Sequence, residues 1–65
     1  MDDRLERATY RTLKSLRRRQ AGEHDLSTDQ VVTTFAGEYG LGTVDHARLA
    51  RAAKEYEAKL KGARQ

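Results

Sequence analysis

The 65-residue sequence contains no cysteine, no proline and no tryptophan. Without cysteine the chain has neither disulfides nor a thiolate-based zinc or iron-sulfur site, which excludes two common supports of very small folds. No apolar run is longer than three residues, so we expect neither a membrane-spanning helix nor a signal peptide. These absences predict one small domain over residues 1–65, in a soluble protein of the cytoplasm.

Charge is abundant and unevenly distributed along the chain, with a net value of +3. Residues 1–20 carry seven basic and three acidic side chains, residues 21–45 carry five acidic and no basic ones, and residues 46–65 carry six basic and two acidic ones. The acidic middle can pair with its basic neighbours inside the molecule. Alternatively, the basic segments can bind a polyanionic partner.

The first predicted helix covers residues 2–20, a segment that has neither glycine nor proline. Acidic residues near its start and basic residues near its end complement the helix dipole. Gly22 follows the helix where a left-handed cap is favoured. The apolar stripe of this helix consists of Leu5, Ala8, Leu13 and Leu16.

The second predicted helix covers residues 27–39. Ser27 and Gln30 have the spacing of a capping box, and Leu26 and Val31 have the spacing of a hydrophobic staple. Gly40 is expected to end the helix in a left-handed conformation, with Leu41 folding back onto its last turn. The expected buried stripe consists of Val31, Val32, Phe35, Ala36 and Tyr39.

The third predicted helix covers residues 43–61, with Thr43 as a cap and residues 62–65 as a frayed tail. Three helices with short connections predict an all-α fold, a three-helix bundle. A trihelical domain with a helix-turn-helix-like arrangement is one form that this bundle can take. The low apolar content also leaves a homodimer open.

The turn between the second and third helices resembles a DNA-binding helix-turn-helix motif. Ala36, Gly40, Leu41 and Leu49 have the spacing of its small, turn and apolar positions. The sequence departs from the motif at His46, where a buried valine or isoleucine is usual. It also departs at Asp45, whose charge opposes a phosphate. A structural corner between two helices accounts for the same spacing.

Two groups of basic residues are candidates for nucleic-acid binding. Arg17, Arg18 and Arg19 form the densest positive charge, and Arg48, Arg51 and Lys54 recur every three positions on the third helix. The alternative for the third helix is an ordinary solvated face, because Arg51, Glu55 and Lys59 have the spacing of i,i+4 ion pairs.

A candidate interface for a partner helix lies on the other side of the third helix. Its residues are Leu49, Ala53, Tyr56 and Leu60. Alanines around this helix would let a second helix approach closely. Tyr10, Tyr39 and Tyr56 are expected at the margin of the core.

The sequence predicts a small binding module without enzymatic activity. His24 with Asp25, and Asp45 with His46, are isolated pairs without further ligands or a nucleophile, so we expect no catalytic residue, metal site or cofactor. The first functional hypothesis is a DNA-binding regulator with a helix-turn-helix-like element. The alternative is a protein-interaction or adaptor module that docks through helix packing. Neither hypothesis involves a membrane or a small-molecule substrate.

Overall fold

The computed structural model describes residues 3–62, which form three helices: α1 (Arg4–Gln20), α2 (Thr28–Glu38) and α3 (Thr43–Gly62). This arrangement confirms the predicted all-α three-helix bundle. Asp2, the predicted start of the first helix, and tail residues 63–65 lie outside the described residues. Gly62, which was expected in the frayed tail, is the last residue of α3.

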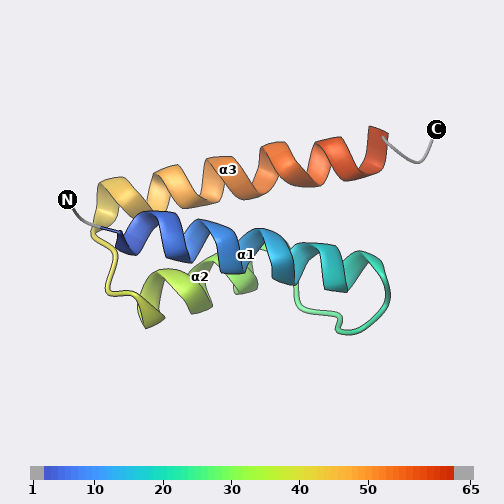
Figure 1. Ribbon diagram of the computed structural model, residues 1–65, viewed down its shortest axis with the longest axis horizontal. Helices are drawn as coiled ribbons and strands as arrows, with labels where there is room; N and C mark the ends of the chain where they lie inside the picture. Colours follow the sequence, from blue (N-terminus) through green and yellow to red (C-terminus); the bar gives the residue numbers. More distant parts are fainter. Residues whose placement is uncertain (1–2, 63–65) are drawn as a thin grey trace.

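Each helix packs against the other two. In Figure 1, α1 and α3 lie side by side and run in the same direction, while α2 runs back in the opposite direction. The bundle is elongated, with extents of 37 × 19 × 17 Å. None of the helices in residues 3–62 has the length and apolar character needed to cross a membrane.

Each connection has a glycine in the left-handed region as its second residue. Gly22 has φ 84°, and the two hydrogen bonds of a Schellman motif follow, from Gly22 N–H to Arg19 O (2.9 Å) and from Glu23 N–H to Arg18 O (3.0 Å). Gly40 has φ 63° and repeats the motif after α2, where Leu41 N–H donates to Ala36 O at 2.9 Å. Both predicted stops are therefore confirmed.

The start of α2 is the capping box that the sequence predicted. The Ser27 hydroxyl accepts from Gln30 N–H at 3.1 Å, and the Gln30 side chain accepts from Ser27 N–H at 2.8 Å. Val31 is buried, but its expected staple partner Leu26 stays 43% exposed. The polar half of this helix start is therefore complete, and its apolar half is only partly covered.

The core is small and assembled from all three helices. On α1 its buried positions are Ala8, Thr12 and Leu16, four residues apart, whereas Leu5 and Leu13 are only partly buried. The remaining buried residues are Val31, Val32 and Ala36 of α2 and Leu49 and Ala53 of α3. Thr12 was not expected there, and its fully buried hydroxyl has no hydrogen-bond partner among the described residues.

Tyr10 corrects the expectation that all three tyrosines lie at the core margin. It is 66% exposed, whereas Tyr39 and Tyr56 are partly buried and pack against the core. Tyr10 is two residues from both Ala8 and Thr12, and a two-residue step crosses a helix to its opposite side. The burial of Ala8 and Thr12 therefore turns Tyr10 toward solvent.

Candidate functional site

A groove of about 590 Å³ lies between α1 and the C-terminal end of α2. Four basic side chains of α1 line it, at positions separated by four, three and four residues, so they share one face of the helix. We call this set the α1 basic ridge: Arg7, Arg11, Lys14 and Arg18. Its other lining residues are Glu6, Tyr10, Ser15, Phe35 and Tyr39.

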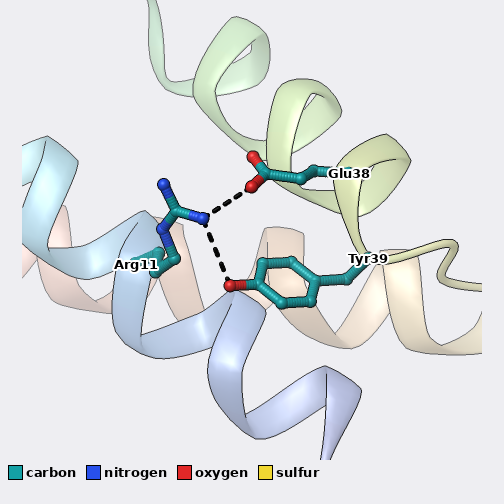
Figure 2. Close-up of polar contacts among 3 residues, drawn as sticks. All are labelled: Arg11, Glu38 and Tyr39. Atoms are coloured by element: carbon teal, nitrogen blue, oxygen red, sulfur yellow. Dashed lines mark hydrogen bonds and ion pairs between the residues drawn. The ribbon is translucent and has the colours of Figure 1, made fainter.

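Arg11 is the ridge residue that joins the two helices. Figure 2 shows its guanidinium reaching from α1 to Glu38 and Tyr39 at the end of α2. Arg11 Nη1 donates to Glu38 Oε1 at 2.6 Å and to the Tyr39 hydroxyl at 3.3 Å. The guanidinium carbon also lies 5.0 Å from the centre of the Phe35 ring. Arg11 therefore anchors the wall of the groove.

The hydrogen bonds to Tyr39 and Glu38, together with the Glu38 charge, raise the pKa of Arg11 above its ordinary value. The two hydrogen bonds therefore favour the charged form of the guanidinium. Its positive charge is partly neutralised by Glu38, so Arg11 contributes more to the shape of the groove than to its net charge.

The other ridge residues differ in how they are paired. Arg18 Nε lies 3.5 Å from Glu23 Oε1, and both side chains are more than half exposed. Such an exposed pair contributes little to stability, so a phosphate or another anion can displace Glu23 from Arg18 at low cost. Within residues 3–62, Arg7 and Lys14 have no carboxylate within ion-pair distance. Two exposed cations are therefore available on one helix face.

The Arg17, Arg18 and Arg19 run does not form one patch. Successive residues of a helix are about 100° apart, so the three side chains diverge. Arg18 belongs to the ridge, whereas Arg19 lines a second groove, between the C-terminal ends of α1 and α3, and Arg17 lines neither. All three are exposed.

Arg48, Arg51 and Lys54 lie on the exposed face of α3 and line neither groove. Arg48 Nη1 lies 3.9 Å from Oδ1 of Asp45, three residues earlier on the helix. The i,i+4 pairs expected for Arg51, Glu55 and Lys59 are not formed within residues 3–62. These cations are solvated, but they lie apart from the ridge.

The candidate partner-helix interface is mostly occupied by the chain itself. Leu49 and Ala53 are 0% exposed and belong to the core, so in this fold neither is available to a partner. Tyr56 packs partly against the core. Leu60 is partly buried at the second groove, which has a volume of about 400 Å³.

The two histidines have structural surroundings. His24 Nε2 donates to Ser15 O at 2.8 Å, and its Nδ1 accepts from Leu26 N–H at 3.3 Å, so the ring ties the connection after α1 back to that helix. His46 is partly buried on the first turns of α3. Across residues 3–62, no group of three or more histidine, cysteine or acidic residues is arranged to hold a metal ion.

Comparison with known proteins gives no assignment, because no family model, curated protein or solved structure matches the chain.

Three of the ridge residues, Arg7, Arg11 and Lys14, were not among the sequence candidates. The signal for them is helical periodicity: basic residues at positions 7, 11, 14 and 18 have the spacing that places side chains on one face of a helix. On this helix the adjacent residues Arg17, Arg18 and Arg19 have the densest charge in the sequence, whereas the ridge is spread along the helix at intervals of one turn.

Proposed function

We propose that this protein is a non-enzymatic DNA-binding module of the cytoplasm that contacts the phosphate backbone through the α1 basic ridge. The observation that carries the proposal is the lining of the α1–α2 groove, where four cations share one helix face and two of them, Arg7 and Lys14, have no ion pair within residues 3–62. Exposed lysines and arginines that neutralise phosphates release counterions, which supplies most of the affinity of sequence-independent binding.

The ridge has better support as the contact surface than the helix-turn-helix-like turn. In Figure 1, α2 and α3 run in opposite directions, as consecutive helices of a plain bundle do. Asp45 opposes use of the turn as a DNA-binding element, because it lies in the first turn of α3, where a recognition helix meets the DNA. Asp45 also forms an ion pair with Arg48, which reduces the positive charge that Arg48 presents to a phosphate.

The test is fluorescence anisotropy with a labelled DNA of about 20 nucleotides, presented as a single strand and as a duplex, over a series of salt concentrations. Each phosphate contact adds about 0.7 (single strand) to 0.9 (duplex) to the slope of log affinity against log salt. The double variant Arg7→Glu, Lys14→Glu is expected to lower the slope by about 1.4 for the single strand and about 1.8 for the duplex, and to weaken binding.

The matched control is Arg51→Glu, Lys54→Glu, which changes the net charge by the same amount on α3. We expect it to leave the slope within about 0.5 of the wild-type value. If the α3 variant lowered the slope more than the ridge variant did, the phosphate contacts would lie on α3, and the proposed role of the ridge would be wrong. Absence of binding to both forms of DNA by the wild-type chain at low salt would refute DNA binding itself.

A further inference from the structure

Tyr10 is the most exposed aromatic ring that lines the groove. It is 66% exposed, whereas Phe35 and Tyr39 are partly buried and pack against the core. Those two rings also lie beneath the Arg11 guanidinium, with ring centres 5.0 and 6.0 Å from its carbon. Phe35 and Tyr39 are therefore occupied within the fold, and Tyr10 offers an uncovered ring face.

Two neighbours of Tyr10 on α1 are the ridge residues that have no ion pair within residues 3–62. Arg7 is three residues before Tyr10 and Lys14 four residues after it, the spacings at which side chains on a helix are adjacent. Glu6, four residues before Tyr10, also lines the groove. An exposed ring therefore lies between two exposed cations, all three on the rim of one groove.

We infer that the ridge binds single-stranded nucleic acid in preference to duplex, with a base stacked on Tyr10 and flanking phosphates near Arg7 and Lys14. This inference rests on the proposed function. Proteins that bind single strands combine a cationic groove with aromatic rings on which bases stack. A duplex keeps its bases stacked inside the helix, so it uses the cations but not the ring. A polyanion without bases, or an acidic peptide, likewise contacts the cations without stacking a base on Tyr10.

The first experiment compares labelled oligo-dT and oligo-rU of about 12 nucleotides with a DNA duplex and with heparin, by anisotropy and by competition. Tyr10→Ala is expected to weaken binding of both single strands by about tenfold, within the range of one lost stacking contact. The same variant should change binding of duplex and heparin by less than about twofold. Tyr10→Phe keeps the ring and should keep single-strand affinity within about twofold. The oligo-dT and oligo-rU arms compare DNA with RNA, and both are expected to depend on Tyr10.

Val44→Ala is the matched control, because Val44 on α3 is exposed to the same degree as Tyr10. It should leave all affinities unchanged. Circular dichroism verifies that each variant is folded, which is expected because neither side chain belongs to the core.

Tyr10→Trp provides a second measurement that reports on the ring itself, since the chain has no other tryptophan. Stacking on a base is expected to quench its fluorescence with oligo-dT and oligo-rU, whereas heparin at equal charge should leave it unquenched.

Several results would overturn the inference while leaving DNA binding through the ridge intact. These are equal affinity for single strand and duplex, Tyr10→Ala without effect on single strands, and no quenching of Tyr10→Trp. If heparin or an acidic peptide bound more tightly than the single strands, the site would recognise negative charge without recognising bases. Absence of binding to every nucleic acid would refute the proposed function as well.

Discussion

Thr12 is the residue at which the core departs most clearly from ordinary burial rules. Its side chain is fully buried, and its hydroxyl has no hydrogen-bond partner within residues 3–62. Leaving such a group unsatisfied costs about 1 to 3 kcal/mol of desolvation. Thr12→Val replaces the hydroxyl by a methyl group of similar size, so we expect the free energy of unfolding to rise by about 1 kcal/mol. Urea denaturation followed by circular dichroism measures the change.

Thr9→Val is the matched control for Thr12→Val. Thr9 is on the same helix and is partly buried, but its hydroxyl donates to Leu5 O at 2.7 Å. Replacing it removes a formed hydrogen bond, so the free energy of unfolding should stay the same or fall. If Thr12→Val also destabilised the protein, the Thr12 hydroxyl would have to be satisfied in solution.

Thr12 and Tyr10 also mark the limit of what the sequence predicts about individual residues. Apolar character places Leu5, Ala8, Leu13 and Leu16 on a broad side of α1, but it does not give the centre of the buried face. That centre is set by where α2 and α3 press on α1, which is a property of the packed molecule. Packing selects the line through Ala8, Thr12 and Leu16, and this choice exposes Tyr10.

At the scale of the elements, the two glycines near the end of α2 have opposite roles. Gly40 has φ 63°, where a residue with a Cβ is strained, whereas Gly37 is helical with open space around the position of a Cβ. We expect Gly40→Ala to lower the free energy of unfolding by about 1 to 2 kcal/mol. Gly37→Ala should raise it by about 0.5 to 1 kcal/mol through helix propensity. Thermal unfolding of the two variants side by side gives the comparison. A stabilising Gly40→Ala would mean that the Schellman turn is not formed.

The Ser27 cap determines where α2 begins. Ser27→Ala removes the acceptor for Gln30 N–H and should cost about 1 kcal/mol in urea denaturation. Ser27→Asp keeps a side-chain oxygen that can accept from the same backbone N–H and serves as the control, with stability expected close to that of the wild type. Equal losses in both variants would show that the serine hydroxyl has another role.

The start of α2 and the ends of α1 and α2 were the best-predicted parts of the fold. The Ser27–Gln30 capping box, Gly22 and Gly40 were each expected from sequence, and the structure confirms all three. Their interactions join residues no more than five positions apart, so the local sequence contains all the information needed. The candidate site lacks this property, because its groove needs Phe35 and Tyr39 of α2 to lie against α1.

The charge pattern shows the same contrast between local and long-range information. The alternation of basic, acidic and basic segments suggested internal pairing, and the Arg11–Glu38 and Arg18–Glu23 pairs join α1 to the acidic middle segment. Which cations remain for a partner depends on these pairings. The sequence therefore suggested that a basic surface exists, but not that Arg7 and Lys14 are its available residues.

For the whole molecule, the small core sets the margin of stability. The buried hydrophobic residues include three alanines, and Leu49 is the largest side chain that is fully buried. A single core in a chain of this size supplies only about 3 to 5 kcal/mol of net stability. Leu49→Ala is expected to cost about 3 kcal/mol or more, which removes most of that margin.

Denaturation of the wild type and Leu49→Ala at protein concentrations tenfold apart distinguishes a core residue from an interface residue. If Leu49 is buried within one chain, the loss should be the same at both concentrations, since self-association is the step that makes apparent stability depend on concentration. Leu60→Ala is the control, because Leu60 is only partly buried and should cost about 1 kcal/mol or less. A midpoint that rises with concentration in the wild type and not in Leu49→Ala would instead place Leu49 between two copies of the chain. The three helices would then have to open to form that contact.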